Sequence, residues 1–71
     1  MANFEVGKDF ETSERAGAGG MFQVDTLKDD NGNDVTDRID VGKHFSNDDE
    51  LKEELSNVFG IPVNDIDLTD L

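Results

Sequence analysis

The sequence contains no cysteine, tryptophan or tyrosine, a single histidine, and no run of apolar residues longer than two. The lack of cysteine excludes a disulfide framework, a thiolate metal site and a cysteine nucleophile. The short apolar runs predict that no segment spans a membrane. The first ten residues, MANFEVGKDF, lack the basic start and apolar stretch of a signal peptide, so we expect a cytoplasmic protein.

Basic residues are also scarce. The chain has six lysines and arginines and 18 aspartates and glutamates, which gives a formal net charge of −12 over 71 residues. Such a charge repels nucleic acid and anionic membranes, so we expect direct binding to neither, and a basic or cationic partner. The length allows a single domain, residues 1–71, which buries only about 60% of its unfolded-chain surface. Dimerisation would add buried apolar area, and a homodimer is therefore one expectation.

The N-terminal third predicts a strand and a loop. Residues 3–10 alternate as a short strand with Phe4 and Val6 on one face, and we expect Phe10 to turn back onto the same core. Residues 11–20, ETSERAGAGG, are rich in glycine and predict a flexible surface loop.

Residues 21–41 predict a central β-hairpin. Asn31-Gly32 is a preferred pair for a two-residue type I′ turn, because both turn positions need positive φ. A register set by this turn aligns apolar residues on one face and opposite charges on the other, which a one-residue slip would destroy. The aligned pairs are Val24 with Ile39, Phe22 with Val41, and Asp25 with Arg38.

Residues 46–59 predict an amphipathic helix, with Ser46 or Asn47 as its N-cap and Gly60 as its end. The expected buried stripe consists of Leu51, Leu55, Val58 and Phe59. Residues 61–71 form a last strand or an extended tail, in which Asp65 and Asp67 would point the same way. The order of elements predicts an α+β fold: a small antiparallel sheet of three to four strands around the hairpin, with the helix packed on it.

Several chemical sites fit the sequence poorly. With Gly32 at the sixth position of an EF-hand loop, Leu27 and Arg38 occupy the first and twelfth positions, where carboxylates are required. So short a chain offers little pocket for a carboxylate pair with separated pKa values. His44, the only histidine, is expected at a strand-to-helix junction. We therefore predict no enzyme, no catalytic residue, no metal and no cofactor.

Residues 51–71 resemble the first helix and following loop of acyl carrier proteins in an acidic amphipathic helix, a Gly-Ile break and an acidic-Ile step. In that family an Asp-Ser-Leu motif follows, and its serine carries the prosthetic arm. No such motif is present in these residues, so we do not expect a carrier function.

The carboxylates fall on every predicted rigid element, as expected of a protein that imitates DNA phosphates. DNA carries one negative charge per about 1.7 Å of axis, and alternate residues of a strand repeat about every 6.8 Å. The predicted partner-binding surface comprises Asp25, Asp37, Asp40, Asp65 and Asp67 on strands, Asp48, Asp49, Glu50, Glu53 and Glu54 on the helix, and Asp29, Asp30 and Asp34 at the hairpin tip.

In size, charge and order of elements, the whole chain resembles phage-encoded DNA-mimic proteins, although no diagnostic motif carries the likeness. The targets of that family include uracil-DNA glycosylase, restriction enzymes and nucleoid proteins such as HU. The resemblance implies an inhibitor of an HU-like protein, as in Bacillus phages, that acts in the host cytoplasm. Two other interpretations stay open: a small acidic structural or adaptor module whose charge serves solubility or salt adaptation, and an anti-defence protein that blocks a nuclease.

Overall fold

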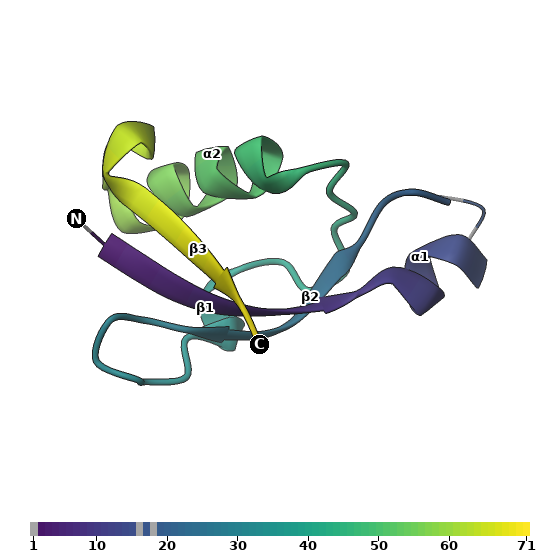
Figure 1. Cartoon of the computed structure of the whole chain (residues 1–71), viewed down its shortest axis with the longest axis horizontal. Coiled ribbons are helices and arrows are strands. Elements are labelled where there is room, and N and C mark those ends of the chain that lie inside the picture. The colour runs from purple at the N-terminus through teal and green to yellow at the C-terminus, as the bar shows by residue number, and fades with distance from the viewer. Residues whose placement is uncertain (1, 16, 18) are drawn as a thin grey trace.

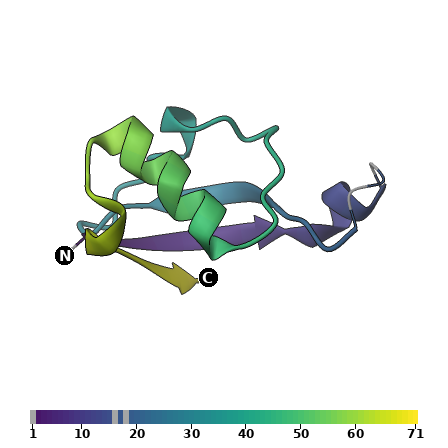
Figure 2. The same ribbon diagram turned by 90° about the horizontal axis from the view of Figure 1, so that it is seen from above.

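A three-stranded sheet with one long helix across one face forms the fold. The computed structural model describes residues 2–15, 17 and 19–71. Strands β1 (Ala2–Asp9), β2 (Gln23–Lys28) and β3 (Ile66–Asp70) lie in the order β2-β1-β3, with helix α2 (Asp48–Phe59) above them (Figures 1 and 2). The α+β class and the number of strands are confirmed. The sheet is mixed rather than antiparallel, because β1 pairs antiparallel with β2 and parallel with β3.

One core lies between the sheet and α2. Phe4 and Val6, at alternate positions of β1, are buried in the same cluster as Leu51 and Leu55 of α2. Full burial of one such side chain contributes about 1.5–3 kcal/mol, so this cluster supplies the main driving force for folding. The other buried members are Phe22, Val24, Leu27, Ile39, Phe45 and Ile66.

The predicted central hairpin is wrong in its turn type and in its second strand, and only the chain reversal is as expected. The chain does reverse at Gly32, whose φ is 80° and whose N–H donates to the Asp29 carbonyl at 3.0 Å. No other residue of this turn has positive φ, so the turn is not type I′. After a single bridge between Lys28 and Asp34, the chain enters a short 3-10 helix, η1 (Thr36–Arg38), and not a second hairpin strand.

On the side of β2 that faces away from β1, the backbone pairing ends at the side chain of Thr36. The Leu27 N–H donates to the Thr36 hydroxyl at 2.8 Å, so this hydroxyl occupies the place of a partner strand's carbonyl. Val35 and Ile39 then pack against the core from the connecting segment. Ile39, which indicated a strand, is therefore buried without forming one.

The predicted cross-strand pairs are replaced by other contacts. The Phe22 backbone exchanges hydrogen bonds of 2.9 and 2.8 Å with Phe45, and their ring centroids lie 5.8 Å apart. Val41, the predicted partner of Phe22, is 49% exposed. Within the described ranges, Asp25 and Arg38 form no ion pair.

The predicted loop over residues 11–20 begins as a short helix, α1 (Phe10–Arg15). Asp9 starts this helix by accepting hydrogen bonds from the Thr12 hydroxyl at 2.6 Å and from the Thr12 N–H at 3.0 Å. These bonds, the hydroxyl first, lower the pKa of Asp9. Residues 16 and 18 of the glycine-rich part lie outside the described residues, so the predicted flexibility of this loop stays a prediction.

Phe10 is not part of the core, contrary to prediction, because it is 55% exposed. Its ring centroid lies 5.5 Å from that of the core residue Phe22. The next turn of α1 is anchored by Ser13, which is fully buried and whose Oγ lies 2.6 Å from Nδ1 of His44. His44 lies shortly before α2, as predicted for the helix side of the junction, but no strand leads into it, because the preceding element is η1.

Helix α2 begins and ends within two residues of the prediction. The Asn47 side chain is the N-cap and accepts from the Glu50 N–H at 2.9 Å. Gly60 ends the helix in the left-handed conformation, with φ of 69°, and its N–H donates to the Ser56 carbonyl. A residue with a Cβ resists this φ, which explains why glycine stands there.

The last third of the chain corrects one expectation and decides between two others. Val58, predicted to be buried, is 38% exposed, whereas Phe59 stacks obliquely on Phe4 at 5.2 Å. The tail forms a 3-10 turn, η2 (Val63–Asp65), followed by β3. The C-terminal segment is therefore a true strand, and it joins β1 rather than β2.

Candidate functional site: an acidic surface

Only two of the five carboxylates predicted on strands lie on strands. Asp25 is on β2 and Asp67 on β3, whereas Asp37 belongs to η1, Asp40 follows η1, and Asp65 ends η2. The prediction is wrong at these three positions because the second hairpin strand is absent and the tail opens with a turn. The spacing argument from strand geometry therefore does not apply to Asp65 and Asp67, which do not share a strand.

The carboxylates predicted on the helix are all there, and we call them the helix group: Asp48, Asp49, Glu50, Glu53 and Glu54 of α2. Three of them lie in the first turn, where the helix dipole favours negative charge. The Glu50 carboxylate also accepts from the Ser46 N–H at 3.1 Å, which fixes its position at the helix start. Four members are exposed, and Glu54 is half-buried.

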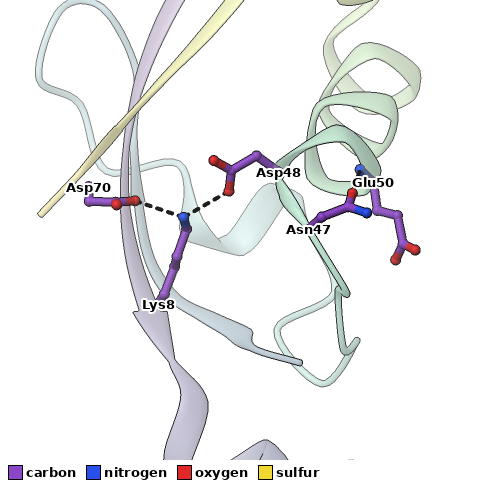
Figure 3. Close-up of polar contacts among 5 residues, drawn as sticks. All are labelled: Lys8, Asn47, Asp48, Glu50 and Asp70. Atoms are coloured by element: carbon purple, nitrogen blue, oxygen red, sulfur yellow. Dashed lines mark hydrogen bonds and ion pairs between the residues drawn. The ribbon is translucent and has the colours of Figure 1, made fainter. Parts of the chain in front are cut away.

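A lysine ties the helix group to the sheet. The Lys8 ammonium lies 2.8 Å from both the Asp48 and the Asp70 carboxylates, joining β1, α2 and β3 (Figure 3). Its side chain is only 13% exposed, and the ammonium sits 5.0 Å from the Phe22 ring centroid. Burial lowers the pKa of Lys8, but the hydrogen bonds to Asp48 and Asp70 outweigh it, and the pKa is raised.

Sequence reasoning missed this bridge. Asp48 was assigned to the partner surface alone, and neither Lys8 nor Asp70 was expected to contribute. No local pattern links positions 8, 48 and 70, because only the packing of β1, β3 and α2 brings them together. Asp48 is therefore partly neutralised within the chain.

An open hollow of about 320 Å³ lies beside α2. Three carboxylates of the helix group border it, together with one ammonium, since Lys43 forms an ion pair with Glu54 at 3.0 Å and lies 5.5 Å from the Phe45 ring centroid. The hollow is thus polar and net negative. Its lining residues are Lys43, Phe45, Glu50, Glu53, Glu54 and Asn57.

Four of the five carboxylates between β2 and α2 form a second set, the turn group: Asp29, Asp30, Asp34 and Asp40. The fifth, Asp37 on η1, is not a member, because no hydrogen bond to its carboxylate is found among the described residues. Asp29 accepts from the N–H groups of Asn31 and Asn33 at 2.9 and 3.0 Å. Asp34 accepts from the Thr36 hydroxyl at 2.6 Å and from its N–H at 2.9 Å, and these bonds lower the pKa of Asp34. These hydrogen bonds therefore fix the direction of both carboxylates.

The other two members of the turn group are held in the same way. Asp30 accepts from the N–H of Asn3, a residue of β1 that lies past the last pair with β2, Glu5 with Lys28. Asp40 accepts from the Gly42 N–H at 2.9 Å. All four members are thus bound by neutral donors, which orient a carboxylate without cancelling its charge.

Few of the negative charges are compensated by ion pairs. Four acidic residues form ion pairs in the described part of the chain: Asp48 and Asp70 with Lys8, Glu11 with Arg15, and Glu54 with Lys43. The other 14 of the 18 acidic residues form none there. Acidic residues outside the predicted surface lie on β1, α1 and β3, namely Glu5, Asp9, Glu11, Glu14 and Asp70.

Among residues 2–15, 17 and 19–71, no three histidine or acidic side chains are grouped to hold a metal ion. Over the same ranges, no helix has the length and apolar character needed to cross a membrane. No protein-family model matches the chain, and comparisons with curated proteins and with solved structures give no match. Function is therefore inferred from the charge and geometry of the acidic surface.

Proposed function

We propose that this protein is a DNA mimic that binds the basic DNA-binding surface of a host nucleoid protein of the HU kind and displaces DNA from it. The observation that carries the proposal is the turn group, whose carboxylates are held by neutral donors. A carboxylate held in this way keeps its charge and its position, as a phosphate does in duplex DNA. The proposed activity is binding, and no catalytic step is involved.

Fixed carboxylates favour tight binding for a physical reason. Ordering a free side chain at an interface costs about 0.5–1.5 kcal/mol, and a side chain that is already hydrogen-bonded avoids much of this cost. The net charge of −12 adds long-range attraction that accelerates encounter with a basic surface. This attraction is screened over a Debye length of about 8 Å at physiological ionic strength, so binding should weaken steeply with salt.

The helix group offers a second set of carboxylates with a regular spacing. Asp49 and Glu53 are one helical turn apart and exposed, so they point to the same side of α2. The proposal includes a homodimer, which would double the charge available to a partner. Sedimentation velocity at micromolar concentration tests this part, and a purely monomeric species would exclude it.

The test is displacement of a fluorescent DNA duplex from purified HU, followed by anisotropy. Added protein should release the duplex at low salt. The amount of protein needed for release should rise strongly as salt is raised from about 50 to 200 mM, the range over which phosphate contacts weaken. No release at any salt concentration would overturn the proposal.

Two triple variants separate specific binding from net charge, because each removes three negative charges. Loss of the turn-group charges should weaken displacement by at least about tenfold, or 1.4 kcal/mol. Loss of the control charges should change the protein concentration needed for displacement by less than about twofold, since single rim charges contribute little. Equal effects would show that only net charge matters. The test variant is Asp29→Asn, Asp34→Asn and Asp40→Asn, and the control is Glu5→Gln, Glu11→Gln and Glu14→Gln.

A second candidate is a structural or adaptor module whose acidity serves solubility or salt adaptation. The observation in its favour is the acidic residues on β1 and α1, well outside the predicted surface. A salt-adapted fold should keep gaining thermal stability up to molar salt, whereas a mimic should gain little once repulsion is screened. Thermal unfolding across this salt range distinguishes the two. Replacing HU with a nuclease in the displacement assay tests the anti-defence interpretation.

A further inference from the structure

The two edges of the sheet differ in how their outward backbone groups are bonded. Along β2, the Phe22 backbone is bonded to Phe45 and the Leu27 N–H to the Thr36 hydroxyl, so this edge is covered. At the opposite edge, β3 has β1 on one side, and no described segment lies beyond it on the other side (Figure 2). The sheet therefore ends at β3 with an open strand.

The register shows which backbone groups point outward from this edge. The Leu71 N–H donates to the Val6 carbonyl at 2.9 Å, on the side of β3 that faces β1. Because successive residues of a strand point their N–H and C=O groups to opposite sides, the groups of Leu68 and Asp70 face away from β1. Neither N–H has a partner in the described part of the chain. Leu68 and Asp70 thus offer bonding groups in the spacing of a strand ladder.

The charges beside this edge select the kind of strand that could join it. Edge strands are commonly protected by charged side chains, proline or a bulge. The sequence of β3, IDLTD, contains no proline, and its pairing with β1 is regular, so charge is what protects this edge. The exposed charges here are the carboxylates of Asp65 and Asp67, while Asp70 turns back to Lys8. Carboxylates repel an acidic strand, including β3 of a second copy, and attract a basic one.

We propose that the open edge of β3 binds an extended segment rich in lysine or arginine, which adds to the sheet as a fourth strand. The inference rests on the proposed function, because it describes how a basic partner engages the acidic protein. Backbone hydrogen bonds to Leu68 and Asp70 hold the added strand, as in other cases of strand addition. Basic side chains on the face opposite α2 then meet Asp67, which provides selectivity for the charge of the segment.

Amide hydrogen exchange of the ¹⁵N-labelled protein tests this docking directly. The probe is a ten-residue peptide of alternating lysine and valine, and its control alternates lysine and proline, with equal charge but half its residues lacking an N–H. The first peptide should slow exchange at Leu68 and Asp70 roughly tenfold, as expected for one new hydrogen bond each. Equal effects of both peptides, or no slowing at these two amides, would overturn the inference. Concentration-dependent slowing without peptide would assign the edge to a second copy and also overturn it.

A pair of charge reversals adds a matched control. Asp67→Lys places an ammonium at the edge, and Glu14→Lys makes the same change in net charge on the exposed face of α1. Affinity for the lysine–valine peptide should fall about fivefold more in the first variant, the effect of roughly 1 kcal/mol. Equal losses would mean that the edge does not recognise the segment. Failure of the proposed function appears separately, as an absence of DNA release from HU, an assay that does not report on Leu68.

Discussion

Replacing Lys8 with methionine should destabilise the fold far more than the loss of one surface charge. Lys8 lies on β1, and its ammonium pairs with Asp48 of α2 and with Asp70 of β3, at 2.8 Å each (Figure 3). It thereby links three elements of the fold. Methionine keeps most of the apolar stem of lysine, so the substitution removes mainly the ammonium, including its cation–π contact with Phe22. Two carboxylates are then left without their shared cation.

The expected loss follows from the exposure of the three groups. A hydrogen bond to a buried charge contributes about 1.5–3 kcal/mol, and an exposed ion pair about 0–1 kcal/mol. The Lys8 side chain is 13% exposed, but Asp48 and Asp70 are 54% and 72% exposed, so each contact lies between these limits. About 1 kcal/mol each gives a loss of about 2 kcal/mol, out of about 4–11 kcal/mol for a chain of this length. The melting temperature should fall by about 10 °C.

Urea unfolding followed by far-ultraviolet circular dichroism measures this loss, because the chain has no tryptophan or tyrosine for fluorescence. The matched control is Lys52→Met on α2, which removes the same charge from a lysine without an ion pair in the described ranges. Lys52→Met should cost less than about 0.5 kcal/mol, the usual range for surface substitutions. Equal losses in the two variants would refute the reasoning, since net charge alone would then explain both.

Three further outcomes are expected in the same unfolding assay. Asn47→Ala should cost about 1 kcal/mol by removing the N-cap of α2, while Asn57→Ala, on the same helix, should cost less. The lowered pKa of Asp34 contributes stability above its unfolded value, about 3.9, so the deficit of Asp34→Asn at neutral pH should shrink as pH falls below about 4. The raised pKa of Lys8 contributes stability below about pH 10.4, and wild type should lose its advantage over Lys8→Met as pH rises further.

Local signals in the sequence predicted the elements that depend on local interactions. Asn47 and Gly60 fix the ends of α2 through contacts within four residues, so the helix and its carboxylates were placed correctly. The alternation of Phe4 and Val6 likewise indicated β1. For the same reason, the helix group was the part of the candidate site that the sequence predicted best.

Pairing between distant segments was not predictable in this way. The hairpin register aligned three pairs of residues, yet β2 pairs with β1 instead, and Thr36 and Val35 fill the other edge of β2. Strand preference depends on the neighbours that a strand finds, which the sequence does not show locally. The three carboxylates predicted at the hairpin tip kept their place because the reversal at Gly32 is local. In contrast, Asp37, Asp40 and Asp65 lost their predicted strands.

The parallel pairing of β1 with β3 has a consequence for synthesis in the cell. The central strand of the sheet is the first to be made and its second partner the last, with residues 10–65 between them. At about 5–20 residues per second, β1 waits about 3–11 s for β3 to be translated. During that interval one side of β1 is unpaired, and for most of it Phe4 and Val6 lack the helix that covers them. The sheet and its core can therefore close only at the end of synthesis, after translation has reached β3.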